Sequence, residues 1–237
     1  SMIYGLGFVA IHIIGGTVAT KQPAMTAAAI ASTISEVKGR KAARFTKLTE
    51  LVVDIMRTQF IAIMGNISIA MPIALLISSL WLYGLGRPLT STASAEHLLH
   101  DLNPFTSLAI FHAAIAGVYL YISGLIAGYY DNLAVHNKIG ERIRNQPTLK
   151  QMMTPVTLLR FSDFIERNLG AIMSNFLFGC FLGSTATIGY IFGLPLDIRH
   201  IAFASANFIH GIFNIYANTG EFPEIGIILV SLFGVMV

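Results

Sequence analysis

Three histidines lie inside apolar stretches of the sequence at intervals of about 100 residues, namely His12, His112 and His210. Ionisable side chains within membrane segments are costly, so they often mark a functional site. Three imidazoles brought together could bind a metal ion or relay protons. However, no second histidine at helical spacing and no carboxylate accompanies any of them in the sequence. Three separate histidines, each hydrogen-bonded to a neighbouring helix, are therefore the simpler interpretation.

Asn66 and Asn175 occupy equivalent positions in a predicted internal repeat. Residues 62–66 (AIMGN) are echoed 109 residues later by residues 171–175 (AIMSN). At the same offset lie three further matches: Asp54 with Asp163, Trp81 with Tyr190, and Gly84 with Gly193. This register predicts a tandem repeat, although a general likeness among apolar helices is the alternative. The two asparagines would form either a polar site between the repeats or hydrogen bonds that fix helix register.

A charged turn, Asp197-Ile198-Arg199-His200, separates two apolar segments. An outward-facing binding site is one interpretation of Asp197, Arg199 and His200. A local salt bridge between Asp197 and Arg199 is the simpler one. A second ion pair, between Asp163 and Arg167, is expected near the start of an apolar helix.

No catalytic group of residues is recognisable, so the chain is not assigned to an enzyme class. The sequence contains neither a P-loop nor a dinucleotide-binding fingerprint. Cys180 is the single cysteine, which excludes an intrachain disulfide and a cysteine-based metal motif. The sequence therefore identifies no cofactor and no specific metal.

The elements that must position these residues are membrane helices. Hydrophobic residues make up 54% of the chain and charged residues 11%, against about 25% in ordinary globular proteins. Residues 58–86, 102–130 and 168–196 carry no Asp, Glu, Lys or Arg, and each window is long enough to cross a bilayer. The composition predicts an all-α, polytopic transmembrane bundle of about six spans.

The six predicted spans form a single transmembrane domain over residues 1–237. Repeat 1 covers about residues 2–86 and repeat 2 about residues 105–194, and two further spans are expected at about 201–217 and 223–237. The chain stops inside an apolar run, so we expect it to be a fragment of a longer protein.

The basic residues predict the orientation in the membrane. Thirteen of the fifteen Lys and Arg residues lie in two connections, residues 21–57 and 131–167. The positive-inside rule places both connections in the cytoplasm. The loops at 87–103 and 194–200 are then expected to face outward, and the chain is predicted to be a multi-pass membrane protein.

Three stretches are similar to a known family. They are ATKQPAMTA at 19–27, GYYDN at 128–132 followed by ERI at 141–143, and FGLPLDIRH at 192–200. Together they resemble the bacterial membrane proteins called site-specific recombinases, or gonococcal-recombinase-like proteins. The resemblance covers nearly all of the chain. It implies the C-terminal membrane part of a larger protein whose amino-terminal part is missing from this sequence.

The expected function is a membrane anchor and assembly module without catalysis of its own, because no charged residue lies securely within a span. Ion-coupled transporters commonly need one. A transporter or channel-like domain with a polar site at the repeat interface is the alternative, and a role in DNA recombination together with the missing cytoplasmic part is a second. Expected partners are the lipid bilayer, that missing part and a second copy of the chain. DNA is not expected, since a duplex cannot reach tyrosines within the spans.

Overall fold

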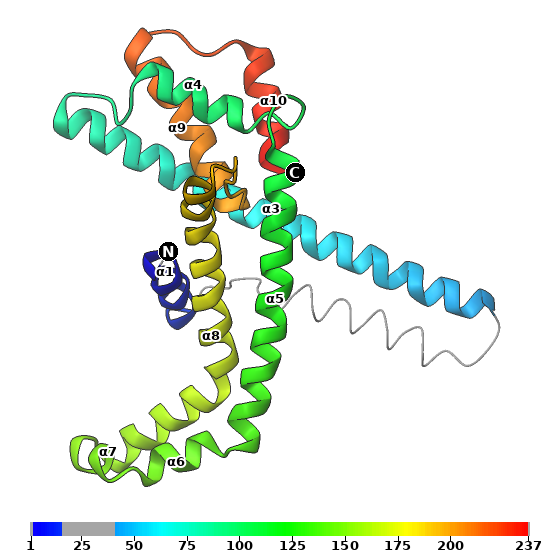
Figure 1. Cartoon of the computed structure of the whole chain (residues 1–237), viewed down its shortest axis with the longest axis vertical. Helices are drawn as coiled ribbons and strands as arrows, with labels where there is room; N and C mark the ends of the chain where they lie inside the picture. Colours follow the sequence, from blue (N-terminus) through cyan, green and yellow to red (C-terminus); the bar gives the residue numbers. More distant parts are fainter. Residues whose placement is uncertain (1, 16–40, 237) are drawn as a thin grey trace. The chain divides into compact units, whose positions relative to one another are not determined.

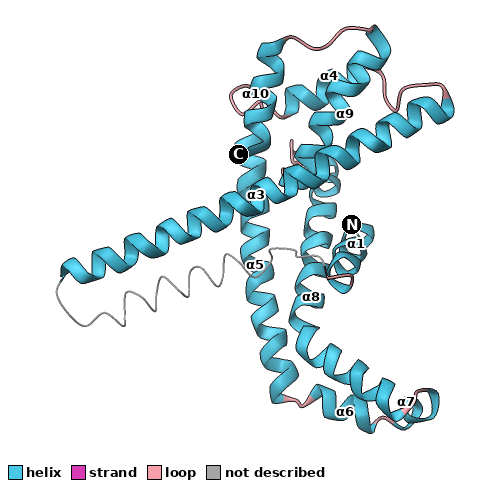
Figure 2. Cartoon of the chain, turned by 180° about the vertical axis from the view of Figure 1, so that it is seen from behind, coloured by secondary structure: helices cyan, strands magenta, loops and turns pink. Residues whose placement is uncertain are grey.

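The described part of the chain is all-helical, as predicted. The computed structural model describes residues 2–15 and 41–236, and within these ranges it contains helices, turns and loops but no strand (Figures 1 and 2). The family-like stretch at 19–27 and most of the basic connection at 21–57 lie outside the described residues. The fold class is therefore confirmed, and the details below concern the described ranges.

Three helices are long and apolar enough to cross a membrane. They are α3 (Lys41–Leu85), α5 (Ala109–His136) and α8 (Pro155–Phe192), and each overlaps one of the charge-free windows. All three continue beyond their apolar window into a basic connection, because a polar segment with good helix formers can prolong a helix past the membrane surface. The described structure thus contains three candidate membrane-spanning helices, as the charge-free windows predict.

The remaining described helices are shorter. Three of them lie where the remaining membrane spans are predicted: α1 (Met2–Ile13), α9 (Ile201–Thr219) and α10 (Ile225–Met236). Three more occupy the predicted loops: α4 (Thr92–Asp101), α6 (Ile139–Asn145) and α7 (Pro147–Met152). Whether α1, α9 and α10 cross a membrane is not decided by their lengths, so the count of about six spans stays a prediction.

The chain divides into two compact units, whose boundaries fall inside α3 and α5. The first unit comprises Ser1–Arg44 and Gly117–Leu196, and the second comprises Phe45–Ala116 and Asp197–Val237. Each unit has its own packing and its own polar side chains, so each is described by itself.

In the first unit, α1 and the second half of α5 both pack against α8. Gly5 of α1 lies against Gly179 of α8, so closely that a side chain on either glycine would overlap the opposite helix. Seven residues further along α1, His12 meets Asn168, which precedes Gly179 on α8, so the two helices are antiparallel. The spacing Gly179-x-x-x-Gly183 predicts such a close contact, and the structure provides it at Gly179.

The pairing of α5 with α8 is also antiparallel. Thr185 Oγ1 donates to Tyr119 Oη at 3.3 Å, and the Gly170 backbone N–H donates to Asp131 Oδ1 at 3.2 Å. By contrast, a Cβ atom on Gly128 would meet no atom within 4 Å in the described structure. The close contact that Gly124-x-x-x-Gly128 predicts is therefore not formed at Gly128.

In the second unit, α4 lies against α9, and α10 covers them both. The core is formed by small and large apolar side chains from these helices: Ala95, Leu99, Leu102, Ala204, Phe208, Ile215 and Val235. Gly211 of α9 faces Leu99 of α4, and Ser231 of α10 donates to the Leu99 carbonyl at 3.0 Å. The short polar helix α4 and the Asn-rich helix α9 thus contribute to one core.

Candidate functional site

Two of the predicted membrane histidines, His12 and His210, have separate hydrogen-bond partners. His12 Nε2 lies 3.1 Å from Asn168 Oδ1 in the first unit, and His210 Nδ1 lies 2.7 Å from Ser78 Oγ in the second. His112 is buried in the second unit, with 6% of its surface exposed. For His12 and His210, these separate hydrogen bonds agree with the simpler interpretation of the sequence. Because His12 belongs to a different unit, the convergence of all three stays a prediction.

Among the described residues, no group of three or more His, Cys, Asp or Glu side chains is placed to hold a metal ion. Hydrogen bonds are thus observed for His12 and His210, and a shared metal or proton site stays a prediction.

The repeat-equivalent asparagines have different surroundings. Asn66 is exposed on α3, and its amide donates to the Ala62 carbonyl of the same helix at 2.8 Å. Asn175 is buried inside the first unit, with 1% of its surface exposed. Each asparagine therefore has a distinct local environment, and a shared polar site between them stays a prediction.

The charged turn at 197–200 is part of a larger polar cluster in the second unit. Arg199 Nη1 donates to Asp197 Oδ2 at 2.7 Å, which is the predicted local salt bridge. Arg199 Nη2 also lies 3.8 Å from Asp101 Oδ2, and His97 Nδ1 lies 2.9 Å from that same Asp101 oxygen. Only 10% of the Arg199 side chain is exposed. A buried guanidinium needs carboxylate partners, which explains why two aspartates flank it.

Sequence reasoning missed the part of this cluster that α4 contributes. Asp101 ends α4, whereas Arg199 precedes α9, so their pairing depends on how the two helices pack. The available signal was the polar segment 96–101, which places His97, His100 and Asp101 in a loop on the same predicted face of the membrane as the charged turn.

His200 caps the start of α9. Its Nδ1 accepts a hydrogen bond from the Ala202 backbone N–H at 3.4 Å, and its ring lies on that of Phe203. Burial lowers the pKa of His200 from 6.5 to about 4. The neutral ring is thus favoured at a helix N-terminus, where a positive charge would also oppose the helix dipole.

This cap predicts a pH-dependent stability. Between about pH 6.5 and about pH 4 the unfolded chain binds a proton at His200 that the folded chain does not, so the free energy of unfolding should fall as the pH falls through this window. The loss should approach roughly 3 kcal/mol near pH 4. Thermal melts at pH 7 and pH 5 would measure it. His200→Asn keeps a capping side chain without titrating, so a variant with an undiminished pH dependence would contradict this role.

A second candidate site lies in the first unit, where α6 is fixed across the start of α8. A Cβ atom on Gly140 would overlap the carboxylate of Glu166, so the α6 backbone lies directly against that side chain. Arg144 Nη1 donates to Asp163 Oδ1 at 2.8 Å and to Ser162 Oγ at 3.2 Å. Asp163 therefore pairs with Arg144, which corrects the expected pairing with Arg167. The correct partner comes from a different helix.

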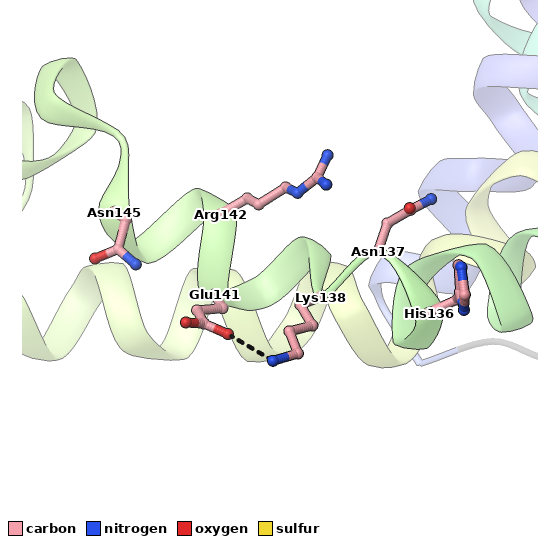
Figure 3. Close-up of a pocket in the computed structure, with 6 residues that line it drawn as sticks. All are labelled: His136, Asn137, Lys138, Glu141, Arg142 and Asn145. Atoms are coloured by element: carbon pink, nitrogen blue, oxygen red, sulfur yellow. Dashed lines mark ion pairs between the residues drawn. The ribbon is translucent and has the colours of Figure 1, made fainter.

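The open side of α6 faces a hollow of about 340 Å³, which we call the α6 pocket. Figure 3 shows its lining residues: His136, Asn137, Lys138, Glu141, Arg142 and Asn145. Lys138 Nζ lies 3.8 Å from Glu141 Oε2. Two cations and one carboxylate line the pocket, so its formal charge is positive even with His136 neutral. Such a surface can bind an anionic group.

Comparison with known proteins gives one match. The chain fits the family model described as "Site-specific recombinase" over residues 1–237. No curated protein and no solved structure matches the chain.

Proposed function

Because the chain belongs to the site-specific recombinase family, we propose that it is the membrane-embedded domain of a family member and serves as an anchor and assembly module. In this proposal the domain holds itself in the bilayer and offers helix surfaces for assembly. It does not itself break or join DNA.

The apolar surface of α3 carries the proposal. In its most apolar window only 6% of the residues are buried by the rest of the described chain. Large side chains are at least half exposed along its length: Ile61, Ile69, Ile73, Leu76, Leu80 and Tyr83. Contiguous apolar surface of this extent is rare on soluble monomers and indicates contact with lipid or with another protein. Lipid is the partner that a helix of this length and composition fits best.

The finer proposal is a multi-pass domain of about six spans in a bacterial inner membrane. The antiparallel pairing of α5 with α8 supports it, since helices on either side of a cytoplasmic connection should cross in opposite directions. The antiparallel pairing of α1 with α8 agrees with the proposed topology, in which these two helices also cross in opposite directions. The basic connections 21–57 and 131–167 would face the cytoplasm. The polar cluster around Arg199 would face the opposite side.

A tandem repeat is part of this proposal. α3 ends at Leu85 and α8 at Phe192, and each is followed by a glycine with a positive φ, Gly86 at 65° and Gly193 at 63°. α4 begins at Thr92 and α9 at Ile201, an interval equal to the 109-residue offset of the sequence echo. The C-terminal ends of α3 and α8 are 107 residues apart, within two residues of that offset, whereas their first residues, Lys41 and Pro155, are 114 residues apart. The repeat is therefore supported by the C-terminal ends of these helices.

The lining of the two described hollows favours the anchor over a transporter. A second hollow, of about 260 Å³ in the second unit, is lined by apolar and aromatic side chains: Leu75, Ile209, Ile212, Phe213, Tyr216 and Phe222. Neither asparagine lines this hollow or the α6 pocket.

Cysteine labelling tests the proposed topology. Ser94 and Gln146 are both exposed in the structure, and the proposal places them on opposite sides of the membrane. Single-cysteine variants at these positions, made on a Cys180→Ala background, should therefore react differently with a membrane-impermeant maleimide applied to intact cells. Ser94→Cys should be labelled in intact cells and Gln146→Cys only after lysis. Labelling of both from the same side would refute the topology, and release of the chain from membranes by alkaline carbonate would refute membrane integration.

A further inference from the structure

We infer that the α6 pocket binds the phosphate group of an anionic phospholipid at the cytoplasmic face of the membrane. This inference rests on the proposed membrane location. It adds a ligand class and a binding residue, Arg142, that neither the family description nor the sequence pattern provides.

The pocket is held in shape by contacts that do not use its lining residues. Gly140 lies against Glu166, and Arg144 is bonded to Asp163 and Ser162 of α8. These contacts occupy one side of α6 and fix it to a long helix. The lining residues on the open side are therefore presented from a supported backbone, which lowers the entropic cost of binding a ligand.

Arg142 is the cation best placed for a phosphate. Glu141 lies close to Lys138 and offsets its charge, whereas the described residues provide no ion pair or hydrogen bond to the Arg142 guanidinium. Figure 3 shows Arg142 and Asn137 directed to one side of the pocket, away from Glu141 and Lys138. A guanidinium can bind two phosphate oxygens at once, and a side-chain amide can donate a further hydrogen bond.

The apolar surroundings favour a lipid over other phosphate-bearing ligands. The pocket lies at the end of α5, whose preceding turns expose Tyr129 and Val135. On the neighbouring α7, Met152 is exposed as well. Tyrosines are enriched at membrane–water interfaces. A phospholipid whose phosphate meets Arg142 can extend its acyl chains along the apolar part of α5, whereas duplex DNA and free phosphate have no apolar group to place there.

The test compares lipid retention by the full chain. The purified protein is mixed with phosphatidylglycerol and phosphatidylcholine of identical acyl chains, and bound lipids are counted by native mass spectrometry. The wild type should retain the anionic lipid in preference, and Arg142→Gln should reduce that preference roughly fivefold, the change expected for one basic residue near a lipid surface. Arg160→Gln is the matched control, because Arg160 is an exposed arginine of α8 outside the pocket. Because Arg160→Gln removes the same single charge from the cytoplasmic connection but leaves the pocket intact, it should lower the preference clearly less than Arg142→Gln does, and an equal decrease in both variants would overturn the assignment to the pocket.

Further measurements distinguish a lipid phosphate from free phosphate and from DNA. Displacement of the lipid by millimolar inorganic phosphate would assign the pocket to free phosphate and overturn the lipid assignment. Binding of a short duplex DNA that is lost in Arg142→Gln would overturn it in favour of nucleic acid. Equal lipid retention by wild type and Arg142→Gln, with both proteins resistant to carbonate extraction, would overturn this inference while leaving the membrane proposal intact. Carbonate release of the wild type would instead overturn the membrane proposal.

Discussion

Replacing Gly179 by valine should separate α1 from α8 and lower the melting temperature of the protein more than any exposed substitution. A Cβ atom at this position would overlap the backbone of Gly5 and Tyr4, and the reciprocal Cβ atom on Gly5 would lie 2.6 Å from the Phe176 carbonyl oxygen. Backbone atoms cannot rotate aside as a flexible side chain can. Overpacking typically costs about 1–3 kcal/mol, and here we expect the upper end of that range.

Gly128→Val is the matched control for this prediction. It makes the same change within a long helix, but at a position where an added Cβ atom would meet nothing within 4 Å in the described structure. At about 2–4 °C per kcal/mol for a chain of this size, Gly179→Val should lower the melting temperature by roughly 5–10 °C more than the control. Fluorescence-monitored melts in one detergent would measure both. An equal decrease in the melting temperature of both variants would mean that the contact at Gly179 does not hold α1 against α8.

The sequence predicted the long helices well because their signal is local. A window without charges, bounded by polar residues, can form few structures other than a membrane helix. The ends of α8 are also readable from the sequence. Thr154 caps its start by accepting from the Thr157 N–H, and Pro155 follows at the first helical position. Gly193 ends the helix with a φ of 63°, a conformation that favours glycine.

The candidate site was less predictable because its contacts join distant parts of the chain. The salt bridge from Asp197 to Arg199 spans two residues and could be predicted, whereas the approach of Asp101 depends on the packing of α4 against α9. Asp163 similarly pairs with Arg144 of α6, not with the neighbouring Arg167. A charge pattern along the sequence indicates which ion pairs are possible, but the helix packing decides which of them form.

The glycine pattern illustrates the same limit. Both Gly179-x-x-x-Gly183 and Gly124-x-x-x-Gly128 predict close helix contacts, yet Gly179 meets α1 whereas Gly128 meets no neighbouring atom in the described structure. Small residues permit two helices to approach closely, but they do not identify the partner. The exposed face at Gly128 is therefore available to lipid or to a second protein.

The Asn-rich sequence of α9 has a structural explanation that leads to the second large prediction. Asn214 is fully buried, and its Oδ1 accepts from the backbone N–H groups of Leu89 at 2.8 Å and Thr90 at 3.2 Å. Its Nδ2 donates to the His210 carbonyl at 2.8 Å. One side chain thus satisfies two backbone donors of the loop between α3 and α4 and attaches that loop to α9.

Asn214→Leu should therefore destabilise the second unit strongly. Leucine has a similar size but no acceptor, so two partly buried N–H groups would lose their hydrogen bonds, at up to about 1–3 kcal/mol each. The free energy of unfolding should fall by roughly 2–5 kcal/mol. The decrease should be measurable as a lower unfolding midpoint and as faster proteolysis between α3 and α4. Asn214→Asp keeps the oxygen that accepts from Leu89 and Thr90, but its second oxygen would face the His210 carbonyl to which Nδ2 now donates. It should therefore recover only part of the stability.

Asn207→Leu provides the control, since it makes the same exchange on the same helix at a partly exposed asparagine. The described structure gives the Asn207 amide no hydrogen bond, so its replacement should change stability little. If Asn214→Leu and Asn207→Leu unfold alike, the loop is not held by Asn214, and the attachment of α3 to the core must come from apolar contacts such as those of Ile67 and Met71. If Asn214→Leu is destabilised more than both Asn207→Leu and Asn214→Asp, the additional loss is due to the missing acceptor.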